Sequence, residues 1–184
     1  MIVLASSSPR RRELLSMLGL DFKVIPSSAD ETVPTGLDPG QTVEYLARIK
    51  AEAVKDSAAE DDIIISADTI VVIDGKIYGK PGNREEAAKM LATLSDRTHE
   101  VYTGLCVNGQ VSHECSRVTF RKLDAQEIED YIDTGEPMDK AGAYGIQGKG
   151  SLLVSHIEGD YFNIMGLPVC RLGQMLKDNG VKII

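Results

Sequence analysis

Three consecutive arginines, Arg10, Arg11 and Arg12, follow a Ser-Pro pair that is typical of a helix N-terminus. Ser8 stands where an N-cap residue is favoured, and Pro9 stands at the first helical position. Cations are unfavourable in this first turn, because the N-terminus is the positive end of the helix dipole and has free N–H groups. An anion would relieve the repulsion, so these residues predict a phosphate site that includes Ser8, Arg10 and Arg11.

The alternative is an ordinary solvated helix that carries arginines by chance, which is the commoner origin of basic tripeptides. The surrounding residues favour the phosphate site. Residues 2–5 form a short apolar segment typical of a strand, so the arginines follow a strand-to-helix turn, where open α/β sheets bind ligands. Leu14, Leu15 and Leu18 supply the buried stripe of the expected helix, and Gly19 ends it.

A single carboxylate, Asp68, interrupts the β-branched run at residues 63–73, which predicts a buried strand followed by an Asp-Gly turn. An unpaired carboxylate there would cost several kcal/mol, so Asp68 is expected to be paired, protonated or directed into a polar cleft. Lys50 and Lys80 are the candidate partners. Lys50 falls on the apolar stripe of a predicted helix, and Pro81 holds Lys80 extended. The alternatives are a structural role for Asp68 and a Lys50 that extends to solvent.

Carboxylates beside fixed cations are typical of a metal-dependent phosphoryl site. A magnesium ion bridges phosphate oxygens and carboxylates, while Arg and Lys hold the remaining charge. Glu31, in the polar loop at residues 27–31, is a second candidate ligand beside Asp68. Its alternative is that of most loop carboxylates, which are simply solvated.

The charge balance of the 184 residues is acidic, with 28 Asp and Glu against 20 Lys and Arg and a formal net charge of −8. Such a chain is a poor general binder of nucleic acid or of anionic membranes, which require a broad basic face. Three cysteines without CxxC spacing argue against a disulfide framework and a zinc site, and predict a reducing cytoplasm. No apolar targeting segment or stretch of 18 apolar residues is present, so neither a signal peptide nor a membrane span is expected.

Strands and helices alternate along the chain, which predicts a mixed α/β sheet in a single domain, residues 1–184. Asparagine or aspartate caps open three helices, and a long hairpin turns at an Asn-Gly pair. The expected elements are helices that begin after Asp38, Asn83 and Asp124, hairpin strands at 101–107 and 111–120, a strand at 152–154, and a last helix from about 168 to 177.

Five blocks of residues together resemble the Maf family of nucleoside triphosphate pyrophosphatases, and they span nearly the whole chain in the expected order. They are Ser-x-Ser-Pro-Arg-Arg at 6–11, Ala67-Asp68-Thr69, Gly79-Lys80-Pro81, the glycine-rich stretch at 140–148, and the segment from Gly159 to Pro168. The resemblance implies an elongated mixed β-sheet flanked by helices, with two lobes around a central cleft, similar to inosine triphosphate pyrophosphatases. It also implies a homodimer.

The activity that the resemblance implies is hydrolysis of a nucleoside triphosphate to the monophosphate and pyrophosphate, with a divalent cation, Mg or Mn, as cofactor. Asp68 matches the proton acceptor proposed for the family. Arg10, Thr69 and Gln147 match three positions that separate its branches. This trio is similar to the dTTP/UTP branch, whereas the 7-methyl-GTP branch has Trp, Ser and Glu there.

The hydrogen-bonding edges of the nucleobases agree with the similarity to the dTTP/UTP branch. Uracil and thymine present an acceptor–donor–acceptor edge, which the amide of Gln147 can meet by both donating and accepting hydrogen bonds. Guanine presents adjacent N–H donors that suit a carboxylate, and 7-methylation makes its ring cationic, which favours an aromatic partner. The chain has no tryptophan.

The resulting hypothesis is a triphosphate held by Ser8, Arg10, Arg11, Lys50 and Lys80 while water attacks the α-phosphorus. Asp68 either activates that water or binds the metal. Two alternative functions remain at this point, a 7-methyl-GTP-type pyrophosphatase and a regulatory nucleotide-binding protein acting on septum formation.

Overall fold

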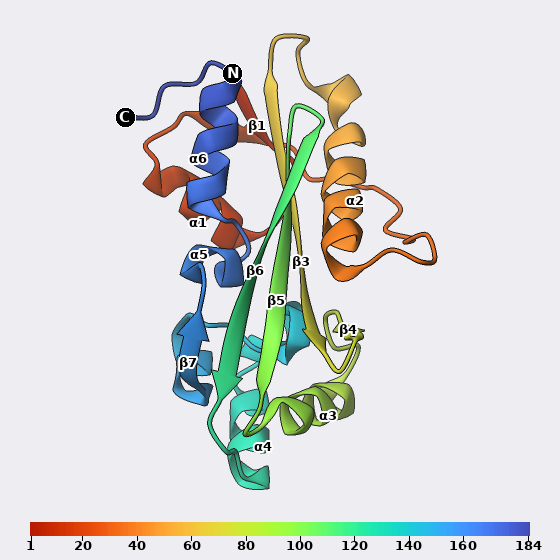
Figure 1. Cartoon of the computed structure of the whole chain (residues 1–184), viewed down its shortest axis with the longest axis vertical. Helices are drawn as coiled ribbons and strands as arrows, with labels where there is room; N and C mark the ends of the chain where they lie inside the picture. Colours follow the sequence, from red (N-terminus) through yellow and green to blue (C-terminus); the bar gives the residue numbers. More distant parts are fainter. The chain divides into compact units, whose positions relative to one another are not determined.

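Helices and strands alternate through residues 1–184, all of which the computed structural model describes (Figure 1). The strands are β1 (Ile2–Leu4), β2 (Phe22–Val24), β3 (Ile63–Ile73), β4 (Lys76–Tyr78), β5 (Thr98–Val107), β6 (Gln110–Phe120) and β7 (Val154–Glu158). The α-helices are α1 (Pro9–Met17), α2 (Pro39–Glu52), α3 (Arg84–Leu94), α4 (Ala125–Asp133), α5 (Tyr161–Met165) and α6 (Val169–Asp178). Short 3₁₀ helices are η1 (Lys55–Ser57), η2 (Glu136–Asp139), η3 (Ala141–Ala143) and η4 (Gly148–Leu153).

All seven strands belong to one sheet, in the order β2-β1-β3-β5-β6-β7, with β4 paired to β3. β1 runs parallel to both β2 and β3, whereas β4 is antiparallel to β3 and β7 is antiparallel to β6. The predicted fold class, a mixed α/β sheet flanked by helices, is therefore confirmed.

Two tight turns connect consecutive strands of this sheet. Asp74 and Gly75 join β3 to β4 with φ values of 51° and 70°, and Asn108 and Gly109 join β5 to β6 with 47° and 82°. Positive φ at both central residues is what a type I′ hairpin turn requires, and Asn, Asp and Gly tolerate it best. Both turns were expected from the sequence and are confirmed.

The chain divides into two compact units. Unit 1 comprises residues 1–69, 103–114 and 162–184, and unit 2 comprises residues 70–102 and 115–161. The boundaries between the units along the chain fall within β3, β5, β6 and α5.

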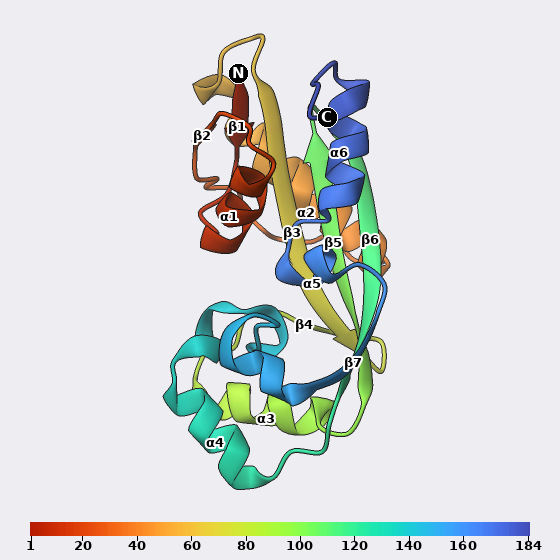
Figure 2. The same ribbon diagram turned by 90° about the vertical axis from the view of Figure 1, so that its left-hand side faces the viewer.

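Unit 1 buries helices against both faces of its strands. α2 covers one face, and α1 and α6 cover the other (Figures 1 and 2). Gly104 of β5 permits this close packing, because a Cβ atom there would stand only 2.1 Å from the Val43 carbonyl oxygen of α2. The buried apolar residues of these helices are Leu14, Leu15, Val43, Leu46, Ala47, Ala51, Leu172, Met175 and Leu176.

The helix starts in unit 1 follow the sequence pattern. Ser8 is the N-cap of α1 and a proline follows it, as expected. Asp38 forms a capping box with Gln41 at the start of α2, in which each side chain binds the other residue's backbone N–H. Val54 is also buried, although the helix already ends at Glu52.

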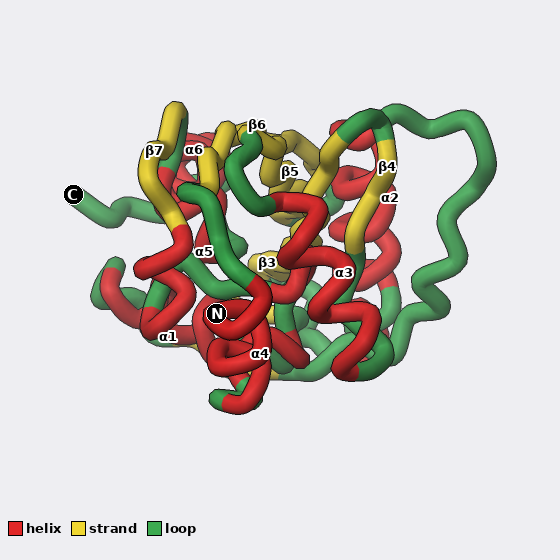
Figure 3. The backbone as a smooth tube through the Cα atoms, turned by 90° about the horizontal axis from the view of Figure 1, so that it is seen from below, coloured by secondary structure: helices red, strands yellow, loops and turns green.

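Unit 2 contains α3 and α4, which lie side by side (Figure 3). Asn83 and Asp124 cap these helices through backbone N–H groups, as the sequence predicted. In the same unit, His99, Phe120 and Tyr144 form a buried aromatic cluster in edge-to-face contact, with ring centroids 4.7–5.3 Å apart. The hydroxyl of Tyr144 lies 2.7 Å from His99 Nε2.

The strand predicted at residues 152–154 is wrong in its bounds. Residues 148–153 form the 3₁₀ helix η4, and β7 begins only at Val154. The Ser151 hydroxyl donates to the Gly148 carbonyl oxygen at 2.7 Å and supports the helical turn. Short elements such as β2, β4 and α5 were not predicted, because three to five residues carry no clear periodicity. None of the helices combines the length and apolar character needed to cross a membrane.

Candidate active site

The residues predicted to act on a substrate are distributed over both units. Unit 1 contains Ser8, Arg10, Arg11, Glu31, Lys50, Asp68 and Thr69, and unit 2 contains Lys80 and Gln147. Within unit 1 the structure brings several of them into direct contact.

Asp68 and Thr69 lie on β3 just beyond the end of β1. The parallel register of β1 and β3 ends at Leu4 and Ile65, and Ala5 donates one more backbone hydrogen bond to the Ile65 carbonyl oxygen, at 2.7 Å. The chain then leaves the sheet toward α1. The following residues of β3 therefore stand at the carboxyl end of β1, the place where open α/β sheets bind ligands.

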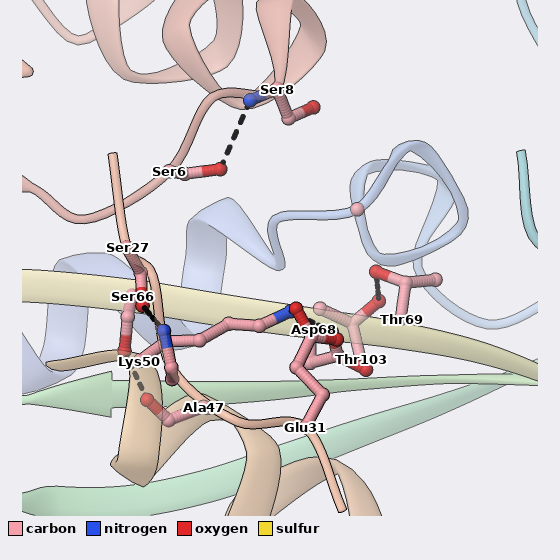
Figure 4. Close-up of polar contacts among 12 residues, drawn as sticks. Ser6, Ser8, Ser27, Glu31, Ala47, Lys50, Ser66, Asp68, Thr69 and Thr103 are labelled. Atoms are coloured by element: carbon pink, nitrogen blue, oxygen red, sulfur yellow. Dashed lines mark hydrogen bonds and ion pairs between the residues drawn. The ribbon is translucent and has the colours of Figure 1, made fainter. Parts of the chain in front are cut away.

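Lys50 occupies the centre of the polar cluster in unit 1 (Figure 4). Its Nζ lies 2.5 Å from Asp68 Oδ1 and 3.1 Å from Glu31 Oε1. The Lys50 and Asp68 side chains are only 13% and 12% exposed, whereas that of Glu31 is 57% exposed. Lys50 thus compensates a buried and an exposed carboxylate at once. Asp68 is paired, and Lys50 does not extend to solvent.

The helix that carries Lys50 is fixed to β3 by a neighbouring hydrogen bond. The buried Ser66 hydroxyl donates to the Ala47 carbonyl oxygen at 2.5 Å (Figure 4). Ser66 is two residues before Asp68 and shares its face of the strand, and Ala47 is three residues before Lys50 on the same side of α2. This bond sets the position from which Lys50 reaches Asp68.

Glu31 comes from the loop between β2 and α2. The neighbouring Asp30 carboxylate accepts hydrogen bonds from the Thr32 backbone N–H at 3.0 Å and from its hydroxyl at 2.7 Å. These bonds lower the pKa of Asp30 below its usual value. They also form a local turn that presents Glu31 to Lys50.

Arg11 connects α1 to β3 and to the residues after α5. Its Nε donates to the Gly166 carbonyl oxygen at 2.7 Å, and its Nη2 donates to the Thr69 hydroxyl at 3.1 Å. Its Nη1 lies 3.5 Å from the Ser6 hydroxyl. Burial lowers the pKa of Arg11, and the negative charge of Asp68 acts in the opposite direction. A guanidinium has more N–H donors than these bonds use, so Arg11 can still bind an anion.

A chain of hydroxyl groups continues from Arg11 through β3 and β5. The Thr69 and Thr103 hydroxyls lie 2.9 Å apart, and Thr103 donates to the Asn163 carbonyl oxygen at 2.8 Å. Since Thr103 uses its proton in that bond, Thr69 donates to Thr103 while it accepts from Arg11. Thr69 therefore has a fixed orientation.

Thr103 and Gly166 were not predicted as site residues. The available signal for Thr103 was a hydroxyl residue on the buried face of β5, between the apolar residues Val101 and Leu105. Gly166 lies in the segment from Gly159 to Pro168 that carries part of the family resemblance, but nothing in the sequence linked it to Arg11.

The N-terminus of α1 keeps the features that predicted an anion site. The Ser8 hydroxyl makes no capping hydrogen bond, and the first turn contains no acidic residue. The Ser8 backbone N–H instead donates to Ser6 Oγ at 3.2 Å (Figure 4). The Ser8 hydroxyl is thus not committed to closing the helix terminus.

The two site residues of unit 2 lie on neighbouring loops. Lys80 is exposed in the loop after β4, and Gln147 is half-buried at the N-cap position of η4. The backbone N–H of Gly142 donates to the Gly79 carbonyl oxygen at 3.1 Å, which joins the loop of Lys80 to the glycine-rich segment of Gln147.

A divalent cation suits the pair of carboxylates around Lys50. No group of three or more Asp, Glu, His or Cys side chains converges in the structure. However, Mg²⁺ is commonly bound by one or two carboxylates together with substrate phosphate oxygens. Glu31 and Asp68 already converge on one cation, the Lys50 ammonium, and carboxylate oxygens are the hard donors that Mg²⁺ and Mn²⁺ prefer.

Comparisons with known proteins agree on one family. The family of Maf-like proteins matches residues 1–179. Proteins named dTTP/UTP pyrophosphatase are similar over the full chain. One from Pelotomaculum thermopropionicum is 50% identical, covering 100% of this chain and 98% of the relative. One from Moorella thermoacetica is 52% identical, covering 99% and 96%, and one from Bacillus anthracis is 46% identical, covering 99% and 97%.

Among solved structures, the Ham1 protein of Staphylococcus aureus aligns with 65% of this chain and 70% of its own, at 19% identity and a TM-score of 0.45.

Proposed function

Because the chain belongs to the family of Maf-like proteins, we propose that it is a nucleoside triphosphate pyrophosphatase that hydrolyses dTTP and UTP to the monophosphate and pyrophosphate. The full-length relatives with that name support the activity. The observation that carries the proposal is the convergence of Lys50, Asp68 and Glu31 beside the Arg11–Thr69 contact. This arrangement combines cations for a triphosphate with carboxylates for a metal or a proton.

The triphosphate is bound by the α1 terminus and by two lysines. Ser8 and Arg10 meet it at the helix N-terminus, where the free N–H groups and the dipole favour anions. Arg11 adds a fixed guanidinium suited to phosphate oxygens. Lys50 and Lys80 contribute point charges, and the assignment of Lys80 comes from the family resemblance.

Hydrolysis proceeds by attack of water on the α-phosphorus. A bond forms between the water oxygen and the α-phosphorus, and the bond from that phosphorus to the oxygen bridging to the β-phosphate breaks. Pyrophosphate leaves with the electron pair, and the proton from water passes to an acceptor or to solvent. Asp68 serves either as that acceptor or as a metal ligand.

Glu31 and Asp68 would hold the divalent cation, Mg or Mn. Such an ion neutralises charge on the phosphate oxygens and so makes the phosphorus more open to attack. With the two carboxylates compensated by that cation, Lys50 would be free to leave its ion pairs and to bind a phosphate oxygen. Lys50 thus compensates both carboxylates in the free protein.

Pyrimidine recognition is assigned to Gln147, with Arg10 and Thr69. The Gln147 side chain makes no capping hydrogen bond to η4, so its amide can both donate to and accept from a uracil or thymine edge. Thr69 is oriented by Arg11 and Thr103. The proposal also includes a homodimer and a cytoplasmic location, the latter supported by three cysteines that form no disulfide.

The test is pyrophosphate release from the purified protein with UTP, dTTP, CTP, GTP and 7-methyl-GTP, in Mg²⁺ and in Mn²⁺. We expect UTP and dTTP to give the highest kcat/KM. Preference for 7-methyl-GTP would replace the pyrimidine assignment, and tight UTP binding without pyrophosphate release would indicate a regulatory nucleotide-binding protein instead.

A further inference from the structure

The segment of unit 2 that carries Gln147, residues 145–150, is held at both ends by two side chains from the α4–η2 region. At its start, the Gly145 backbone N–H donates to the Tyr131 hydroxyl at 3.1 Å. At its end, the backbone N–H groups of Lys149 and Gly150 donate to the Glu136 carboxylate at 3.1 and 3.0 Å. Gln147 lies between these attachments.

The two attachments form one network. The Tyr131 hydroxyl donates to Glu136 Oε1 at 2.9 Å, so the group that binds Gly145 is itself oriented by the group that binds Gly150. Tyr131 is buried and Glu136 is half-buried. Burial and the nearby Glu136 charge both raise the pKa of Tyr131, which keeps its hydroxyl protonated and able to donate. Hydrogen bonds to a carboxylate are stronger than those between neutral groups.

The glycines of this segment allow its two ends to touch. A Cβ atom on Gly150 would lie 2.0 Å from the Gly145 carbonyl oxygen and 2.6 Å from the Tyr131 hydroxyl. Gly148 has a φ of +67°, and a Cβ atom there would lie 2.8 Å from a Glu136 carboxylate oxygen. The backbone therefore closes tightly around the Tyr131–Glu136 pair, and the Gln147 side chain is left without a capping bond of its own.

We propose that Tyr131 and Glu136 are positioning residues for base selection, which fix the backbone on both sides of Gln147 and thereby orient its amide toward a pyrimidine. The inference rests on the proposed function, because it takes Gln147 as the residue that reads the base. Two hydrogen bonds to a base edge form only within narrow limits of distance and angle, so a mobile backbone would weaken recognition. Neither residue needs to contact the substrate for this effect.

Glu136→Gln is the main variant, because it keeps the size of the side chain but removes one acceptor oxygen and the charge. Glu129→Gln is the matched control, because Glu129 of α4 makes an exposed ion pair with Arg84 of α3. Tyr131→Phe is the second variant, and it removes only the hydroxyl.

Hydrogen exchange of the free protein reports directly on the hydrogen bonds by which Tyr131 and Glu136 hold the backbone of residues 145–150. We expect the amides of Lys149 and Gly150 to exchange at least about tenfold faster in Glu136→Gln, and that of Gly145 in Tyr131→Phe, with no change in Glu129→Gln.

Kinetics then test the role in base selection. In both variants we expect the ratio of kcat/KM for UTP to that for GTP to fall about tenfold, mainly through a higher KM for UTP. Inhibition by inorganic triphosphate should stay unchanged, because the cations that bind it are untouched. A variant that is merely damaged in its folding would weaken both UTP hydrolysis and inhibition by inorganic triphosphate.

Unchanged hydrogen exchange at these amides would show that Tyr131 and Glu136 do not hold the backbone around Gln147. Faster exchange with an unchanged ratio of kcat/KM for UTP to that for GTP would show that this backbone does not contribute to base selection. A wild-type protein that releases no pyrophosphate from UTP would overturn the proposed function and this inference together. A wild-type protein that is active on UTP, with variants that keep its selectivity, would overturn the inference alone.

Discussion

The Lys50 cluster of unit 1 and the Gln147 segment of unit 2 are built on opposite principles. In the Lys50 cluster, the side chains proposed to act are themselves paired: one ammonium compensates Asp68 and Glu31. In the Gln147 segment, the backbone is bound by Tyr131 and Glu136, and the side chain proposed to act makes no capping bond.

This difference agrees with the tasks proposed for the two regions, which are binding of metal and phosphate by the Lys50 cluster and base selection by Gln147. Charge pairs can exchange one cation for another at a modest net cost, so the cluster can accept a metal or a phosphate when substrate arrives. Selection of a base depends on the placement of a neutral amide, which needs a rigid backbone rather than an exchangeable partner.

The largest effect is expected from Asp68→Asn. If Asp68 transfers a proton, kcat for UTP should fall by roughly 10²–10⁴-fold, because the amide cannot accept the proton from water. The measurement is pyrophosphate release at saturating UTP and Mg²⁺, and the exposed Asp61→Asn is the control. Unchanged turnover in a folded Asp68→Asn protein would remove Asp68 from the mechanism.

Gln147→Glu should change the base preference by up to about 100-fold. A carboxylate cannot donate to the acceptors of uracil or thymine, but it can accept from the adjacent N–H donors of guanine. The ratio of kcat/KM for UTP to that for GTP should therefore fall, while the exposed Gln110→Glu leaves it unchanged. Equal losses on both nucleotides would show that Gln147 does not distinguish the bases.

The buried aromatic cluster of unit 2 should make stability dependent on pH. Burial lowers the pKa of His99 from 6.5 to about 4, so His99 is neutral in the folded protein at a pH where the unfolded chain binds a proton. Its contribution is present above pH 6.5 and is lost as the pH falls from 6.5 toward 4. Between pH 7 and pH 5 the free energy of unfolding should fall by roughly 2 kcal/mol from this residue.

Urea unfolding of His99→Gln and of the exposed His156→Gln at both pH values measures this contribution. The pH dependence should shrink in His99→Gln and persist in His156→Gln. A wild-type-like decrease in His99→Gln would show that other groups cause it.

The smallest effect concerns metal binding without nucleotide. Lys50→Met leaves Asp68 and Glu31 without their shared ammonium, so we expect Mn²⁺ alone to bind about tenfold more tightly. Titration followed by electron paramagnetic resonance measures the free ion, and the exposed Lys55→Met is the control. Weaker Mn²⁺ binding in Lys50→Met would contradict the view that Lys50 and the metal compete for these carboxylates.

The sequence was informative where a local pattern determines the structure. The Ser-Pro-Arg start of α1, the capping boxes at Asp38 and Asp124, and the strand at 63–73 with its Asp-Gly turn all depend on neighbouring residues. The resemblance to the Maf family is likewise confirmed by the comparisons. An interrupted apolar pattern also led to the Lys50–Asp68 pair.

The contacts that orient the site residues could not be predicted, because they join residues far apart in the chain. Gly166 lies 155 residues after Arg11, to which it is hydrogen-bonded, and Thr103 lies 34 residues after Thr69. The same holds for the backbone amides bound by Glu136, which no sequence pattern marks. The strand placed at residues 152–154 failed because two leucines and a valine fit the end of a 3₁₀ helix as well as a strand.

The central claim is that water attacks the α-phosphorus of a pyrimidine triphosphate. Hydrolysis of UTP in water labelled with a heavy oxygen isotope, followed by mass spectrometry of the products, tests it most directly. The account predicts one labelled oxygen in UMP and none in pyrophosphate. Label in pyrophosphate, or formation of UDP and labelled phosphate, would contradict it.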